Sequence, residues 1–345
     1  AAGSSPVTPA TELSIMKKII ISNFVIFFLI IIFLEFFVRF FGLAVVVGTS
    51  KNLFNYDKNL NFNNKNIEAK AFGKEVFTDN NGFRVPNNIY SYNKNLKSIL
   101  IIGDSTTFGV GVEEELSFIG LTRDNKKDIN FYNASVIGHS LNDYKKTIDK
   151  FKGLEFEKIF LFININDIHF ASGVAPTNDE IKYEKDRYLK FIENIKKQRV
   201  LGELNVFFRS KSALYMYLKS VLSNPQQRYF ELIYPYYLND QITSKYKEYL
   251  TQIKDISTKK RKEIFFIILP YEYQTRKNNC ISELLLPQKK INKYLEELNL
   301  NYRDFTQDFC NFNKSNKLYL PFDPTHLSKE GHKFVYSLLK EYFNN

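Results

Sequence analysis

Ser105, Asp323 and His326 are the residues of this sequence best suited to nucleophilic chemistry. A serine hydroxyl is a weak nucleophile until a neighbouring base removes its proton. A histidine can be that base, and a carboxylate bound to its second ring nitrogen keeps the ring in the required orientation. Asp323 and His326 stand three positions apart in the run Asp-Pro-Thr-His, close enough to share one loop. We therefore predict that Ser105 is a nucleophile activated by His326 and Asp323.

Three further groups could bind the negative oxygen that forms when a serine attacks an ester. They are the backbone N–H of Ser105 at a helix start, the N–H of Gly138 and the side-chain amide of Asn166. Such donors often make the largest single contribution to catalysis by acyl-transfer enzymes. We predict that Ser105, Gly138 and Asn166 form an oxyanion hole.

The elements that must position these residues are short apolar runs that alternate with helix-like stretches. The apolar runs cover 98–102, 129–132, 159–163 and 264–269, and a weaker fifth run surrounds Tyr302. The helix-like stretches lie at about 113–125, 140–152, 240–258, 286–297 and 328–343. This alternation indicates a doubly wound α/β fold, with a parallel sheet covered on both faces. Ligands of such sheets bind at the carboxyl ends of the strands, where the predicted site residues stand.

Other parts of the chain do not follow this alternation. Residues 49–96 are rich in Asn and Lys and predict a juxtamembrane linker with a small β-like lead-in, whose Asn81-Gly82 pair suits a hairpin turn. Residues 171–235 are polar and Lys-rich, with helix-like pieces near 178–197 and 211–222. We interpret this second segment as a helical insertion within a domain that spans residues 97–345.

The order of the chemical blocks resembles the SGNH (GDSL-like) family of serine hydrolases and acyltransferases. The matching positions are Ser105 within Gly-Asp-Ser, then Gly138, Asn166, and the pair Asp323 and His326. The resemblance covers roughly residues 77–343 and implies a three-layer, flavodoxin-like sheet. It also implies the roles that the residue chemistry predicts for the triad and the oxyanion hole.

Two stretches are similar to a membrane-anchored bacterial subgroup of this family. They are Gly-Asp-Ser-Thr-Thr-Phe-Gly-Val-Gly-Val, at 103–112, and Asn-Gly-Phe-Arg, at 81–84. One position departs from the family pattern, because the third block usually reads Gly-x-Asn-Asp and Asn164 occupies the glycine position. An asparagine there either narrows the pocket or adds a hydrogen-bond donor.

The resemblance implies an esterase that removes acyl groups, foremost O-acetyl groups, from a cell-envelope carbohydrate through an acyl-enzyme on Ser105. The first alternative is an O-acyltransferase that passes the same acyl group to a sugar hydroxyl. In this case a membrane acyl-donor protein supplies the acyl group. A second alternative is a non-catalytic binding or assembly protein on the same scaffold, against which the complete triad argues. A lipase acting on the adjacent bilayer is a weaker idea.

A membrane segment precedes the predicted domain. The chain is uncharged and almost entirely apolar from 19 to 34, and the apolar character continues to Val47 with Glu35 and Arg39 as the interruptions. About 20 apolar residues cross a bilayer as a helix, and a helix would pair charges spaced i and i+4. We predict an uncleaved anchor at 16–48, the alternative being a secretory signal cut near 42–48. The preceding residues 1–15 are expected to be tag-like or disordered.

Lys17 and Lys18 precede this apolar run. The positive-inside rule then places the N-terminus in the cytoplasm and the domain on the periplasmic or extracellular side of the inner (cytoplasmic) membrane. If the domain is exported, Cys280 and Cys310 form either one disulfide or two buried free thiols. No Cys-x-x-Cys motif or His/Asp/Glu cluster indicates a metal, and no cofactor is expected.

The net charge of +11 is spread along the chain, with one cluster at 259–262 that we interpret as a solvated helix end. No nucleic-acid-binding motif accompanies it, so nucleic acid is not an expected partner. His139 and His169 either line the pocket or are structural, the structural role being the commoner, and His332 is expected to be structural. Asp104 and Asp167 are expected to brace loops.

Overall fold

The computed structural model describes residues 9–55, 60–168, 199–260 and 262–343. Within these ranges the central sheet has eight strands, in the order β10-β9-β8-β6-β7-β5-β4-β3. Its parallel strands are β6 (Lys97–Ile102), β7 (Ile129–Asn133), β8 (Lys158–Asn164), β9 (Glu263–Leu269) and β10 (Asn301–Asp304). Numbered along the chain, these five lie in the order 2-1-3-4-5, which is the flavodoxin-like doubly wound arrangement. The predicted fold class is confirmed.

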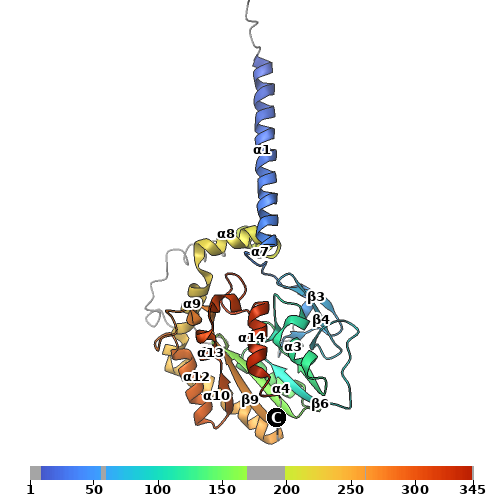
Figure 1. The fold of residues 1–345 in the computed structure, drawn as a ribbon, viewed down its shortest axis with the longest axis vertical. Helices are drawn as coiled ribbons and strands as arrows, with labels where there is room; N and C mark the ends of the chain where they lie inside the picture. The colour runs from blue at the N-terminus through green and yellow to red at the C-terminus, as the bar shows by residue number, and fades with distance from the viewer. Residues whose placement is uncertain (1–8, 56–59, 169–198, 261, 344–345) are drawn as a thin grey trace, which may run out of the picture.

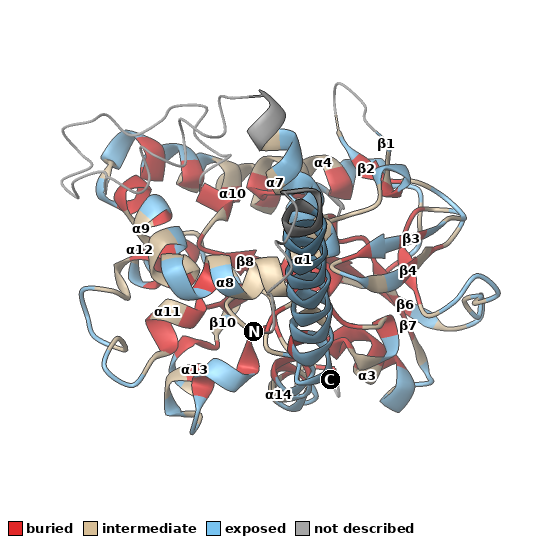
Figure 2. Ribbon diagram, turned by 90° about the horizontal axis from the view of Figure 1, so that it is seen from above, coloured by how far each residue is buried: buried red, intermediate tan, exposed pale blue. Residues whose placement is uncertain are grey.

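Helices cover both faces of the sheet, which explains why its strands are apolar on both sides. One face packs against α4 (Leu141–Lys150), α9 (Pro225–Leu238), α10 (Asp240–Lys260) and α12 (Leu286–Glu297). The other face packs against α3 (Phe118–Asn125), α13 (Thr306–Asn311) and α14 (Lys329–Leu339). In β6, Leu100 and Ile102 belong to the first core while Ile99 and Ile101 belong to the second. Figure 2 shows the buried residues gathered along the sheet and the inner sides of these helices.

Three antiparallel strands extend the sheet beyond β7: β3 (Glu68–Ala71), β4 (Lys74–Thr78) and β5 (Arg84–Val85). The β3–β4 turn places Phe72 and Gly73 at φ of 50° and 79°, a pair of left-handed residues that suits a tight hairpin. The predicted Asn81-Gly82 turn joins β4 to β5. The lead-in before residue 97 is therefore part of the central sheet, which the linker interpretation did not anticipate.

Shorter elements complete the described chain. They are β1 (Phe54–Asn55), β2 (Phe62–Asn63), α2 (Ser105–Phe108), α11 (Glu272–Thr275), and the 3-10 turns η1 (Lys51–Leu53), η2 (Glu114–Leu116) and η3 (Ser315–Leu318). Strands β1 and β2 form a separate antiparallel pair.

Helix α1 (Pro9–Phe40) stands away from the body of the molecule (Figure 1). It begins at Pro9, so residues 9–15 of the segment expected to be tag-like or disordered are helical. Residues 1–8 lie outside the described part. Its segment Ser14–Phe40 has a mean hydropathy of 2.8 and no buried residue in its most apolar stretch, so it is long and apolar enough to cross a membrane.

The described part of the predicted insertion forms α7 (Arg199–Lys211), α8 (Ala213–Ser223) and α9. The predicted helical piece at 211–222 corresponds to α8, and the piece at 178–197 lies outside the described residues. Helix α9 contributes buried aromatic and aliphatic side chains to the main core. Helices α7 and α8 instead lie at the foot of α1 (Figure 1).

Cys280 and Cys310 form a disulfide, with their Cα atoms 6.0 Å apart. Of the two alternatives left open by the sequence, the structure has the bonded pair. The bond fastens the segment that follows α11 to the helix α13.

We expect the Cys280→Ser, Cys310→Ser double variant to lose about 3–4 kcal/mol of unfolding free energy, because the bond closes a 30-residue loop. Urea denaturation of the full chain in detergent, with and without a thiol reductant, measures the loss. The reductant should lower the midpoint of the native protein and leave that of the double variant unchanged. Equal midpoints for the native protein in both conditions would contradict the prediction.

Candidate active site

Ser105 begins helix α2 directly after strand β6, at the carboxyl end of the parallel sheet. Asp104 caps this helix, since its carboxylate accepts a hydrogen bond from the Thr106 N–H at 2.8 Å. The turn is tight enough to require glycine at 103, because a Cβ atom there would lie 2.3 Å from the Thr107 hydroxyl. The sharp strand-to-helix turn therefore presents the Ser105 side chain at the end of the sheet.

The three predicted catalytic residues come together in one hydrogen-bonded chain. The Ser105 Oγ lies 2.8 Å from Nε2 of His326, and Nδ1 of His326 lies 2.8 Å from Oδ2 of Asp323. The Asp323 side chain is buried and that of His326 is 14% exposed. This is the order of contacts that a serine nucleophile, a histidine base and an orienting carboxylate require.

The loop carrying Asp323 and His326 is held by its own backbone. The second carboxylate oxygen of Asp323 accepts hydrogen bonds from the N–H groups of Thr325, at 2.9 Å, and His326, at 2.7 Å. The hydroxyl of Thr325 is also 2.8 Å from that of Thr106. This contact joins the loop of Asp323 and His326 to helix α2. The sequence interpretation missed both threonines, although each is adjacent to a triad residue.

Burial and charge act in opposite directions on the pKa of His326. Burial of the ring lowers the pKa, but the attraction and hydrogen bond of Asp323 outweigh burial, with Asp104 adding to the attraction. The net result is a pKa raised above the ordinary histidine value of 6.5. A raised pKa makes the neutral ring a stronger acceptor for the Ser105 proton.

The β3–β4 hairpin adds an aromatic side chain to the site. The ring of Phe72 meets the His326 ring edge-on, with the centroids 5.0 Å apart. This contact shields part of the His326 imidazole and restrains the plane of its ring. The sequence does not predict this position of Phe72. The β3–β4 hairpin lies beyond β7 in the sheet, whereas Ser105 follows β6, so no local pattern brings the two together.

Two of the predicted oxyanion donors, Ser105 and Gly138, would contribute backbone N–H groups. Within the described residues, no atom accepts a hydrogen bond from the N–H of Ser105 or from that of Gly138. Gly138 has φ of +85°, and a Cβ atom at this position would meet nothing within 4 Å. Asn166 also lies at the site, where its amide nitrogen is 3.4 Å from the Asp104 carboxylate. Their joint role as an oxyanion hole stays a prediction.

Asn164, the departure from the family pattern, acts as a hydrogen-bond donor. Its side-chain amide donates to Asp104 at 3.0 Å. Its backbone N–H donates to the Asp167 carboxylate at 3.0 Å, and the Tyr144 hydroxyl donates to the same carboxylate at 2.8 Å. Burial, reinforced by the nearby Asp104, raises the pKa of Asp167 well above its usual value. Both aspartates brace loops, as predicted.

The remaining histidines divide as follows. His332 is fully buried, and its Nδ1 accepts a hydrogen bond from the Phe118 N–H at 3.2 Å. Burial is the main cause that lowers the pKa of His332, and the nearby Arg84 and His326 lower it further, to about 3. His332 is therefore a neutral structural residue. His139 is buried with Nε2 2.6 Å from the Asn61 carbonyl, which is also a structural contact. His169 lies outside the described residues.

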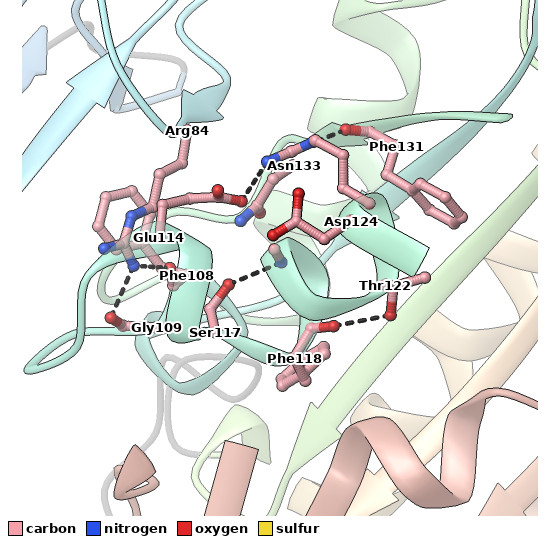
Figure 3. Close-up of polar contacts among 12 residues, drawn as sticks. Arg84, Phe108, Gly109, Glu114, Ser117, Phe118, Thr122, Asp124, Phe131 and Asn133 are labelled. Atoms are coloured by element: carbon pink, nitrogen blue, oxygen red, sulfur yellow. Dashed lines mark hydrogen bonds and ion pairs between the residues drawn. The ribbon is translucent and has the colours of Figure 1, made fainter. Parts of the chain in front are cut away.

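Arg84 holds the segment that follows the nucleophile helix (Figure 3). Its buried guanidinium donates to the carbonyl oxygens of Phe108, of Gly109 at 2.6 Å and of Val112 at 2.7 Å. Burial lowers its pKa to about 10, so the group is still charged at neutral pH. Arg84 therefore explains the Asn-Gly-Phe-Arg stretch. The hairpin turn positions the Arg84 guanidinium so that it hydrogen-bonds to the carbonyl groups at the end of α2 and in the loop that follows it.

No protein-family model and no curated protein matches this chain. Solved structures do resemble it. A member of the lipolytic G-D-S-L family from Veillonella parvula is 13% identical, with a TM-score of 0.40, over 72% of this chain and 99% of that one. A lipase/acylhydrolase from Enterococcus faecalis is 13% identical, with a TM-score of 0.42, over 72% of this chain and 95% of that one. An acetyl xylan esterase, AlAXEase, is 12% identical, with a TM-score of 0.41, over 71% and 98%. Similarity at this level carries no conclusion about activity, so the chemistry of the site rests on the contacts described above.

Proposed function

We propose that this chain is a serine hydrolase that cleaves carboxylic esters through an acyl-enzyme on Ser105. The observation that carries the proposal is the unbroken chain of contacts from Asp323 to His326 to Ser105, with 2.8 Å at each step. His326 takes the Ser105 proton as the hydroxyl oxygen attacks the ester carbonyl, and gives it to the departing alcohol. Water then attacks the acyl-enzyme, with His326 again as the base.

The negative oxygen of each tetrahedral intermediate needs hydrogen-bond donors. We propose the N–H groups of Ser105 and Gly138, together with the side-chain amide of Asn166. The N–H groups of Ser105 and Gly138 support this role, because neither donates to another atom among the described residues and both are therefore available to bind the negative oxygen.

We propose an O-acylated, foremost O-acetylated, carbohydrate of the cell envelope as the substrate. A cleft of about 920 Å³ adjoins the loop that carries Asp323, and its lining includes Phe322, the preceding residue. Amide and cationic side chains make up about half of this lining, among them Asn313, Asn316, Lys277 and Lys314. Such groups suit the hydroxyls and anionic groups of a polysaccharide better than the hydrocarbon chain of a lipid.

We further propose that α1 anchors the protein in the inner (cytoplasmic) membrane, with the N-terminus in the cytoplasm and the catalytic domain outside it. The length and apolar surface of α1 support the anchor. Lys17 and Lys18, at its cytoplasmic end, support the orientation. The Cys280–Cys310 disulfide supports an oxidising compartment for the domain.

The limited exposure of His326, the proposed base, favours the alternative of an O-acyltransferase. The side chain of His326 is 14% exposed, and the Phe72 ring covers one of its edges. Restricting water at the acyl-enzyme gives a sugar hydroxyl the advantage in the second step. In this version a membrane protein supplies the acyl group, and the cleft beside the Asp323 loop holds the acceptor.

The decisive experiment incubates the full chain, in detergent micelles, with a chromogenic acetyl ester, with and without a soluble envelope oligosaccharide. Release of acetate without the oligosaccharide supports the esterase. Acetylated oligosaccharide supports the transferase. If neither product forms and mass spectrometry finds no acetyl group on Ser105, the catalytic proposal fails and a binding or assembly protein becomes the better description.

A further inference from the structure

Glu35 and Arg39, near the C-terminal end of α1, bind the helices α7 and α8 to it. The Glu35 carboxylate accepts hydrogen bonds from the hydroxyl of Ser212, at 2.7 Å, and from the N–H groups of Ala213 and Leu214, both at 2.9 Å. These donors lie at the N-terminus of α8, where backbone N–H groups lack partners within the helix. Glu35 therefore caps α8 from a distance of 177 residues in sequence.

The partner of Glu35 secures the neighbouring helix. The guanidinium of Arg39 lies 2.6 Å from Glu35 and donates to the carbonyl of Lys211, the last residue of α7, at 2.5 Å. Val38 and Ala44 pack with Ala213 beside these polar contacts. The Glu35–Arg39 pair, predicted from its spacing, thus fixes α7 and α8 to the foot of α1. We call residues 199–223, which form α7 and α8, the collar.

The collar exposes large apolar side chains. On α8, Leu218, Val221 and Leu222 are 52%, 56% and 81% exposed, and their spacing of three and four residues places them on one face. On α7, Val206 and Phe207 are 63% and 55% exposed. Apolar surface gathered in this way marks a site of contact with a membrane or a protein.

The position of the collar indicates that its apolar side chains contact a membrane rather than a protein. Figure 1 shows α8 running across the end of α1, between α1 and the body of the molecule. The 27-residue segment Ser14–Phe40 is about 40 Å long at 1.5 Å per residue, longer than a hydrocarbon core of about 30 Å. The end of α1 that carries Glu35 and Arg39 therefore reaches the headgroup level, and the collar lies there with it.

A groove between α1 and α7 has the chemistry of a phospholipid site. Its volume is about 350 Å³. The walls are apolar and the charged groups include two cations; the lining is Ile31, Ile32, Glu35, Phe36, Arg39, Phe207, Phe208, Lys211 and Ser212. Apolar walls suit an acyl chain, and the cations Arg39 and Lys211 suit a phosphate.

We infer that the collar lies in the outer headgroup boundary of the bilayer, with Phe207 and Leu222 among the acyl chains. A phospholipid occupies the groove, its phosphate near Arg39 and Lys211. This arrangement is that of an amphipathic helix pair lying in the plane of the interface, buried by about 5–10 Å. The inference rests on the proposed membrane anchor and is independent of the proposed catalysis.

Single-tryptophan variants test this placement cleanly, because the chain contains no tryptophan. The full chain is reconstituted into phosphatidylcholine–phosphatidylglycerol vesicles with plain or brominated acyl chains, since bromine quenches only a tryptophan at its own depth. Leu222→Trp and Phe207→Trp probe the collar. Phe33→Trp, 67% exposed on α1, is the reference for the span, and Ile89→Trp, 86% exposed on the body, is the reference for water.

We expect brominated lipid to quench the Leu222→Trp and Phe207→Trp variants about twofold or more, as it quenches Phe33→Trp, and to leave Ile89→Trp unchanged. Quenching of Phe33→Trp without quenching of the two collar variants would overturn the collar inference while leaving the anchor intact. Blue-shifted but unquenched emission from the collar variants would mean that a protein surface covers the collar, which also overturns it. Absence of quenching in all four variants would overturn the anchor itself.

Discussion

Replacing Ser105 with alanine is expected to lower the rate of ester hydrolysis by about 10⁴-fold or more. The variant is expected to keep the fold, because among the described residues the hydroxyl hydrogen-bonds only to Nε2 of His326, at 2.8 Å. It removes the atom that forms the acyl-enzyme, so neither the esterase nor the transferase reaction can proceed. The measurement is release of acetate from a chromogenic acetyl ester by the full chain in detergent.

Ser135→Ala is the matched control for this variant. Ser135 follows the neighbouring strand β7, is fully buried, and its hydroxyl has no hydrogen-bond partner among the described residues. Its rate should stay within a few-fold of the native rate. Hydrolysis by Ser105→Ala at a rate close to that of Ser135→Ala would show that Ser105 is not the nucleophile.

Replacing Asp323 with asparagine is expected to lower the rate at saturating substrate by about 10³- to 10⁴-fold. The asparagine can occupy the same space, but one of its two oxygens becomes an N–H₂ group. The native carboxylate accepts from Nδ1 of His326 and from two backbone N–H groups. One of these three contacts must be lost, and the imidazole loses the charge that stabilises its protonated form.

The pH dependence of this variant separates a catalytic effect from a purely structural one. Catalysis needs neutral His326, so the native rate should rise with pH through a His326 pKa above 6.5, the direction in which Asp323 shifts it. Without the carboxylate, the burial of the ring dominates and the pKa falls. The acidic limb of kcat/KM should therefore move to lower pH while the plateau drops.

Asp124→Asn, which removes only an exposed ion pair with Lys127, provides the control for loss of one negative charge. Its pH profile should coincide with that of the native protein. An Asp323→Asn profile with the limb at its native position would mean that Asp323 does not set the pKa of the base, and the triad assignment would fail.

The parallel part of the fold is predictable because its signal is local. Runs such as Ile-Phe-Leu-Phe-Ile, at 159–163, are buried on both faces, and only a strand in a covered parallel sheet explains them. The same holds for the triad, since strand order and the rule for sheet ends place Ser105 near the loop of Asp323 and His326. Local patterns therefore predict the scaffold and the three residues that the structure brings into contact.

The parts that escaped prediction depend on contacts between distant segments. The sequence predicts a β-like lead-in with a turn at Asn81-Gly82, but not its place in the central sheet. Strands β3 to β5 have only two to five residues, and they join that sheet through pairing with β7 and with one another. Glu35 was recognised as one half of a helical ion pair, but its cap on α8 involves residues almost two hundred positions away. The edge-on contact of Phe72 with His326 follows from the same unpredicted hairpin.

The long separation of Ser105 and His326 in the chain has a consequence for biosynthesis. The two residues are 221 positions apart and meet only after the segment that carries His326 has joined the fold. On the proposed topology the chain leaves the cytoplasm from its N-terminal end, so Ser105 arrives outside well before its base. If Ser105 is the nucleophile as proposed, the emerging polypeptide therefore carries a hydroxyl that cannot yet react, and the order of translation keeps the site inactive until His326 has followed.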